Sequence, residues 1–150
     1  MNKRKPITIL MADDDPEDIM LSEDALEEAR LANDFYSVGD GVELMDFLCR
    51  RGDYTDPKTS PRPGLILLDL NMPRKNGFES LKDLKGDPDL RQIPVIVLTA
   101  SKTEEDIYRS YDLGVNSFIS KPVSFDGLVH AMKIIGQYWF EIVAQPPSNE

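Results

Sequence analysis

Charged and hydroxyl side chains stand directly after several short apolar runs of the sequence. Three consecutive aspartates, residues 13–15, end the first run, and Asp69 ends the third. Thr99 ends the fourth run, and Lys121 follows shortly after the fifth. Carboxylates bind hard cations, while a hydroxyl and an ammonium group suit the oxygens of a phosphoryl group. If the fold gathers these positions, they predict cation-assisted phosphoryl chemistry.

A divalent cation would explain how several carboxylates could share one pocket. Like charges repel, and they destabilise a pocket unless they are protonated or a cation lies between them. Mg²⁺ needs only one or two protein carboxylates and keeps waters and phosphate oxygens as its other ligands. It also offsets charge on a phosphoryl group in transfer, which leaves a carboxylate free to act as the nucleophile. We therefore expect Mg²⁺ as the cofactor.

The alternation of apolar and amphipathic stretches predicts the elements that must position these residues. Strands are expected at residues 7–12, 35–38, 65–68, 94–98 and 115–119. Helices are expected at residues 16 to about 30, 42–48, 77 to about 85, 103–112 and 125 to about 143. This alternation is typical of an α/β fold with a doubly wound, flavodoxin-like parallel sheet of five strands in the order 2-1-3-4-5 and five helices. Strands one and three are then neighbours at the switch point of the topology, where such sheets bind ligands.

The composition favours a single domain that neither crosses a membrane nor binds nucleic acid. We expect one domain over residues 1–150, with its core from about residue 7 to 143, in the cytoplasm. No apolar run approaches the roughly 20 residues that a membrane span needs. The net charge of −10 would repel a phosphate-rich partner. One cysteine, Cys49, and one histidine, His130, exclude a disulfide within the chain and any mechanism that needs two histidines.

Taken together, these features resemble the receiver domains of two-component signalling. Each feature is weak alone, but all of them occur in the family's order on the predicted elements, from about residue 7 to 143. They are the pair Asp13-Asp14 before Pro16, the segment LILLDLNMP that contains Asp69, Gly77, Thr99-Ala100, and Lys121-Pro122. The resemblance implies a phosphoacceptor response regulator, a signalling protein rather than an enzyme, that a histidine kinase phosphorylates.

The resemblance also implies roles at the cation site. Asp69 would be the phosphoacceptor and a metal ligand. Asp14 would bind Mg²⁺ directly and Asp13 through water, and Asn71 would offer its backbone carbonyl. Asp15 has no role in this scheme.

The resemblance further implies a conformational switch. Thr99 would be the switch hydroxyl, and Phe118 would fill the aromatic switch position, where a tyrosine is common. Lys121 would contact the phosphoryl group, and its bond to Pro122 would be cis. Phosphorylation would draw Thr99 toward the phosphoryl group and let Phe118 repack, which changes a protein-binding surface near strands four and five.

Within the family, the chain is similar to the single-domain regulators that are paired with bacterial and cyanobacterial phytochromes. The similarity lies in the proline-containing loop at residues 50–63, the segments LILLDLNMPRKNG and DPDLRQIPVIVLTAS, and a long aromatic last helix. It implies a phytochrome-type histidine kinase as the phosphoryl donor. The downstream partner, a protein, stays unidentified.

Three other functions compete with this interpretation. An aspartate-nucleophile phosphatase needs an acid two residues after the nucleophile, where this chain has Asn71. A nucleotide or flavin binder needs a phosphate-binding loop after strand one, where this chain has acids. A non-phosphorylated adaptor of the same fold stays open.

The last predicted helix suggests an interface. Its apolar stripe continues beyond the length that packing against the sheet requires. Tyr138, Trp139 and Phe140 are consecutive and cannot all face one core. Because large aromatic side chains outside a core favour partner surfaces, we expect a homodimer through the last two helix–strand units.

Overall fold

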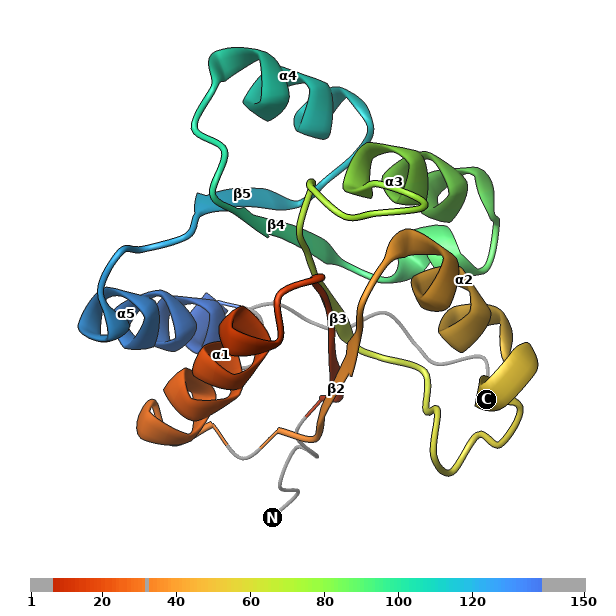
Figure 1. Cartoon of the computed structure of the whole chain (residues 1–150), viewed down its shortest axis with the longest axis horizontal. Coiled ribbons are helices and arrows are strands. Elements are labelled where there is room, and N and C mark those ends of the chain that lie inside the picture. The colour runs from red at the N-terminus through yellow and green to blue at the C-terminus, as the bar shows by residue number, and fades with distance from the viewer. Residues whose placement is uncertain (1–6, 32, 139–150) are drawn as a thin grey trace.

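The computed structural model describes residues 7–31 and 33–138 and contains one parallel sheet of five strands (Figure 1). The strand order β2-β1-β3-β4-β5 confirms the predicted topology. The strands are β1 (Ile9–Ala12), β2 (Phe35–Val38), β3 (Leu65–Leu68), β4 (Val95–Thr99) and β5 (Ser117–Ser120). All four neighbouring pairs run parallel.

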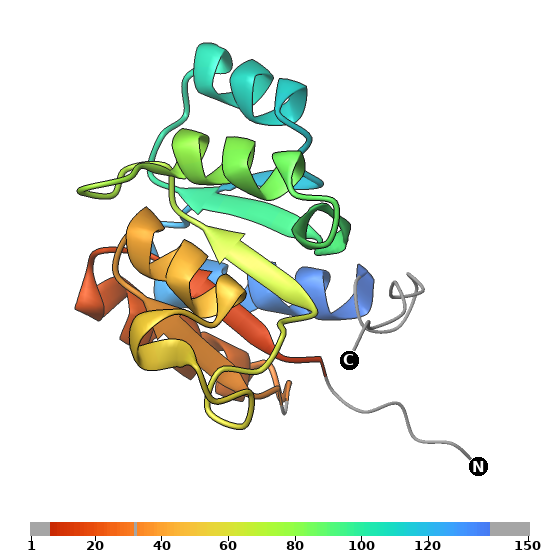
Figure 2. The same ribbon diagram turned by 90° about the vertical axis from the view of Figure 1, so that its right-hand side faces the viewer.

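Helices cover both faces of the sheet, as the doubly wound topology requires (Figures 1 and 2). On one face lie α1 (Pro16–Glu28) and α5 (Phe125–Gly136). On the other lie α2 (Gly41–Cys49), α3 (Gly77–Gly86) and α4 (Glu104–Asp112), with the short 3-10 helices Gly52–Tyr54 and Leu90–Gln92. No helix in the part of the chain described has the length and apolarity that crossing a bilayer requires.

Alternate side chains of the central strands fill two separate cores. In β1, Leu10 faces the cluster beneath α2 and α3, while Ile9 and Met11 face the cluster beneath α1 and α5. Every residue of β1, β3 and β4 is buried, which explains why these strands appear in the sequence as continuous apolar runs. The edge strand β5 is only partly buried.

Several element boundaries differ from the sequence prediction. Strand β5 begins at Ser117 rather than at residue 115, because the Val115 N–H donates to the Ser110 carbonyl and still belongs to the turn after α4. Helix α4 begins one residue later than predicted, since Thr103 is its N-cap and accepts from the Asp106 N–H. The predicted extension of the last helix to residue 143 lies mostly outside the described residues.

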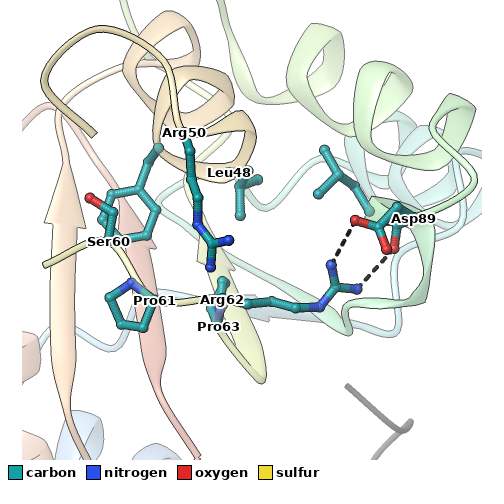
Figure 3. A pocket seen from close by; sticks show the side chains of 9 residues that line it. Leu48, Arg50, Ser60, Pro61, Arg62, Pro63 and Asp89 are labelled. Carbon is teal, nitrogen blue, oxygen red and sulfur yellow. Dashed lines mark hydrogen bonds and ion pairs between the residues drawn. The ribbon is translucent and has the colours of Figure 1, made fainter. Parts of the chain in front are cut away.

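The proline-containing loop at residues 50–63 is attached at the edge of the sheet where the strands begin. The Arg62 guanidinium forms an ion pair with the Asp89 carboxylate at 3.0 Å and donates to the Asp89 carbonyl at 2.9 Å (Figure 3). A cavity of about 180 Å³ beside this pair is walled by Phe47, Leu48 and Pro61, among others. The loop therefore joins α2 to the segment before β4, at the edge opposite the strand ends that carry the predicted chemistry.

The first residue of α3 lies against the backbone that leaves β3. The Gly77 N–H donates to the Leu70 carbonyl at 3.0 Å. A Cβ at Gly77 would lie 2.4 Å from the Asp69 carbonyl oxygen and 2.7 Å from the Leu70 Cα. Only glycine permits this approach, which sets the position of the loop between Asp69 and α3.

We predict that Gly77→Ala lowers the free energy of unfolding by about 1–3 kcal/mol, because the added methyl group collides with backbone that cannot yield cheaply. Gly86→Ala is the control within the same helix, since a Cβ there meets nothing within 4 Å. This control should be neutral or more stable by up to about 1 kcal/mol, from the higher helix propensity of alanine. Urea unfolding of both variants measures the difference, and equal stability would contradict the close approach at Gly77.

Candidate functional site

The carboxyl ends of β1, β3, β4 and β5 bring the sequence-predicted residues together. Asp13 and Asp69 follow the adjacent strands β1 and β3, and the Asp69 N–H donates to the Ala12 carbonyl at 3.0 Å. Thr99 ends β4, and Lys121 follows β5. Parallel strands all end at one edge of a sheet, so residues far apart in the sequence share one site.

One oxygen of the Asp69 carboxylate accepts two hydrogen bonds, and the other oxygen faces the Lys121 ammonium group. Its Oδ1 accepts from the Thr99 hydroxyl at 2.7 Å and from the Asn71 N–H at 3.3 Å. Its Oδ2 lies 3.6 Å from the Lys121 Nζ. Asp69 is 6% exposed and Thr99 is fully buried, so the hydroxyl has a fixed partner in this pocket.

Three carboxylates form a cluster with the geometry of a cation site. Asp13, Asp14 and Asp69 each offer one oxygen, and these oxygens all lie within 4.8 Å of one another. The three oxygens are therefore close enough together to share one hard cation such as Mg²⁺. Burial raises the pKa of Asp13, although the Lys121 ammonium and the Asp15 N–H both act to lower it. A hard cation would offset the cost of burying the charged Asp13 carboxylate. The three carboxylates offer only oxygen ligands, which hard cations prefer.

Lys121 is shared among the acids of the site. Its Nζ donates to Asp13 Oδ2 at 2.6 Å and to Asp18 Oδ2 at 2.8 Å. Burial acts to lower the pKa of Lys121, but the hydrogen bonds to the two carboxylates outweigh burial and raise it. The side chain is therefore a fixed positive charge at neutral pH.

Asp18 is a site residue that sequence reasoning missed. It lies in the first turn of α1, where the helix dipole favours an acid in any case. In the sequence, Asp18 therefore could not be told apart from an acid that only interacts with the helix dipole. The contact with Lys121 joins residues that are 103 positions apart.

The structure assigns Asp15 a local role. Its side chain accepts from the Glu17 N–H at 2.9 Å and caps the N-terminus of α1. It is exposed and does not belong to the three-carboxylate cluster. The third aspartate of the run is thus a helix cap.

The structure bears on two further expectations from the resemblance, the bond before Pro122 and the position of Phe118. The Lys121–Pro122 bond is trans, because no cis peptide bond occurs among the described residues, so the expected cis bond is wrong here. The two forms of such a bond differ by only about 0.5–1 kcal/mol, which a motif alone does not decide. Phe118 is partly buried against the core beneath α2 and α3. It lies on β5, which pairs with β4, the strand that Thr99 ends.

Of the three residues proposed for an interface, the structure describes Tyr138. Tyr138 is half exposed. Trp139 and Phe140 lie outside the described residues. The expected homodimer therefore stays a prediction.

Comparison with known proteins places these features in context. The sequence matches the response regulator receiver domain over residues 9–133. It is 39% identical over 141 residues to the response regulator Rcp1 of Synechocystis sp., and the match covers 94% of each chain. The solved structure of the phosphorylated cyanobacterial phytochrome response regulator RcpA is similar, with a TM-score of 0.87, 38% identity and coverage of 95% of this chain and 100% of that one. The Mn²⁺-bound form of Rcp1 is similar with a TM-score of 0.84, 39% identity and the same coverage.

We predict that Asp18→Asn lowers the free energy of unfolding by about 0.5–1 kcal/mol, because it removes an attraction to Lys121 that solvent partly screens. Glu17→Gln is the matched control, an exposed acid in the same helical turn. Both changes remove one negative charge near the same helix dipole, so their difference reports the contact with Lys121. Chemical unfolding measures it, and equal losses in the two variants would argue against that contact.

Proposed function

The chain belongs to the response regulator receiver family, and we propose that it is a phosphorylation switch of two-component signalling in which Asp69 accepts a phosphoryl group with Mg²⁺. The observation that carries this proposal is the setting of the Asp69 carboxylate. Thr99 and Asn71 donate to one of its oxygens, Lys121 faces the other, and Asp13 and Asp14 lie beside it.

The reaction follows from these groups. The Asp69 carboxylate attacks the phosphorus of the donor, a P–O bond forms, and the bond from phosphorus to the donor breaks, with its electron pair leaving on the donor. Mg²⁺ would be held by Asp14 and Asp69, by Asp13 through water and by the Asn71 carbonyl, and would offset the charge of the phosphoryl oxygens. The Thr99 hydroxyl, now on Asp69 Oδ1, donates to a phosphoryl oxygen instead. Lys121 moves from its carboxylate partners toward another phosphoryl oxygen.

The output follows from the movement of Thr99. This residue ends β4, and the loop after it is joined to α4 by a hydrogen bond from the Ser101 hydroxyl to the Asp106 carboxylate. Helix α4 has one buried residue, Ser110, so little core packing opposes its displacement. Phe118, on the adjacent strand, repacks as Thr99 moves. The surface of α4 and β5 then takes a second arrangement that a downstream protein distinguishes.

We propose a histidine kinase of the phytochrome type as the phosphoryl donor. One similar protein supports this choice: RcpA, at 38% identity, whose solved structure is that of a cyanobacterial phytochrome response regulator. A homodimer through the last two helix–strand units, with Tyr138 in its interface, is part of the same proposal.

The competing enzyme function has little support. Asn71 occupies the position where an aspartate-nucleophile phosphatase needs its general acid, and an amide does not donate a proton at neutral pH. The adaptor function differs from the switch in one respect: an adaptor needs no phosphoryl transfer to Asp69.

We predict that incubation with acetyl phosphate and Mg²⁺ produces a retarded band on a phosphate-affinity gel, and that Asp69→Asn abolishes it. Asp24→Asn is the control, an exposed aspartate on α1 away from the site. It should give the same retarded band as the wild type. A wild-type protein that shows no retarded band at any Mg²⁺ concentration would favour the adaptor. Turnover of a small phosphoester that depends on Asp69 would favour the phosphatase.

We predict that Asp14→Asn weakens Mg²⁺ binding by at least about tenfold, because it removes a charged oxygen ligand. Asp15→Asn should leave the affinity within about twofold, because asparagine caps a helix as well as aspartate does. Titration calorimetry without a phosphoryl donor measures both affinities. Equal effects of the two neighbouring substitutions would contradict the proposed ligand set.

A further inference from the structure

The loop between Asp69 and α3 is attached to the start of α2 by an ion pair. The Nε and Nη2 atoms of Arg74 both lie 2.8 Å from Asp40 Oδ2. The other oxygen of Asp40 accepts from the Glu43 N–H at 2.8 Å, as the N-cap of α2. One carboxylate therefore caps a helix and holds an arginine 34 positions away.

Asp40 is a buried charge for which the phosphoryl chemistry has no direct use. Its side chain is 12% exposed, while the Arg74 side chain is 59% exposed. Burial acts to raise the pKa of Asp40, but the hydrogen bonds from the Glu43 N–H and from Arg74 outweigh burial and lower it. The carboxylate is thus ionised at neutral pH, and Arg74 supplies its opposite charge.

The backbone of the same loop makes a second contact with α2. The Gly41 N–H donates to the Lys75 carbonyl at 3.0 Å. A Cβ at Gly41 would lie 2.5 Å from that carbonyl oxygen, so the loop and the helix touch directly. Arg74 itself has a left-handed backbone, with φ of 61°. This conformation is unfavourable for a residue with a side chain, so the loop needs an outside contact to hold it.

This loop carries groups that the proposed reaction needs. Asn71 is three residues before Arg74, and its N–H donates to Asp69 Oδ1. Gly77 closes the loop by donating to the Leu70 carbonyl. A shift of the loop would therefore move Asn71 relative to Asp69.

We propose that Arg74 is a positioning residue that, through its ion pair with Asp40, holds the β3–α3 loop in the arrangement that presents Asn71 and Asp69 to Mg²⁺. This inference rests on the proposed function and adds to it a pair that lies outside the carboxylate cluster. Precise sites on loops depend on such support from neighbouring elements.

The test compares Mg²⁺ affinities of Arg74→Gln, Asp40→Asn and the double variant, measured by calorimetry without a phosphoryl donor. The two single changes alter the net charge in opposite directions. Long-range attraction alone would strengthen Mg²⁺ binding in Arg74→Gln and weaken it in Asp40→Asn. Positioning predicts instead that both weaken it by about fivefold and that the double variant is no worse than either.

Two further variants separate positioning from general effects. Arg51→Gln is the control, because the Arg51 side chain has nearly the same exposure, 60%. Arg51 follows the C-terminus of α2 and forms an ion pair at 3.2 Å with Asp46 of that helix. Arg51→Gln should not weaken Mg²⁺ binding. Arg74→Lys keeps the charge but loses one of the two nitrogen contacts, and should fall between wild type and Arg74→Gln.

A metal-free readout accompanies the titration. Amide hydrogen exchange at Gly41, whose N–H bonds to the loop, should quicken in Arg74→Gln and Asp40→Asn but not in Arg51→Gln. Mg²⁺ binding by Arg74→Gln as tight as that of the wild type, with unchanged exchange at Gly41, overturns the positioning role and leaves the proposed function standing. A wild-type protein that binds no Mg²⁺ overturns the proposed function, and this inference with it.

Discussion

Two buried carboxylates, those of Asp13 and Asp69, lie together where neighbouring strands end, and the surrounding groups all act on their charge. Burial raises the pKa of Asp13, and the nearby charge of Asp69 acts in the same direction. Lys121 donates to Asp13 and stands near Asp69, while Thr99 donates to the other oxygen of Asp69. Breaking such a partly buried set of charges is expensive, so these positions constrain one another. A hard cation would offset this concentration of negative charge, and in the proposed function it would also offset the charge of a phosphoryl group.

The two edges of the sheet have different roles. The edge where the strands end carries the acids, the hydroxyl and the ammonium. At the opposite edge, Arg62 and Asp89 join a long loop to the segment before β4. Between them, the two hydrophobic cores bury every residue of β1, β3 and β4. Helix α4 is less well packed, because Ser110 is its one buried residue. It follows β4, the strand that ends in Thr99. The proposed switch would use this difference in packing, because α4 has little buried surface to lose when it moves.

The support of the β3–α3 loop extends the site beyond the residues that touch its ligands. Asn71 donates to Asp69 from a loop whose backbone is left-handed at Arg74. Asp40 and Gly41, at the start of α2, hold that loop by an ion pair and a backbone hydrogen bond. The geometry at Asp69 therefore depends on a helix that offers no ligand of its own.

The sequence by itself determined the fold and most of the site. Continuous apolar runs in β1, β3 and β4 predicted buried parallel strands, and the alternation with helices predicted their order. Because parallel strands end at one edge, the positions of Asp13, Asp69, Thr99 and Lys121 after four strands were enough to predict that they meet. Only the tertiary structure decided the contacts that pair residues far apart without a pattern, namely Asp18 with Lys121 and Arg74 with Asp40. It also decided that the bond before Pro122 is trans. Strand and helix periodicity is a local property that the chain carries in its order of residues, whereas an ion pair across 103 or 34 positions depends on side-chain distances that exist only after packing.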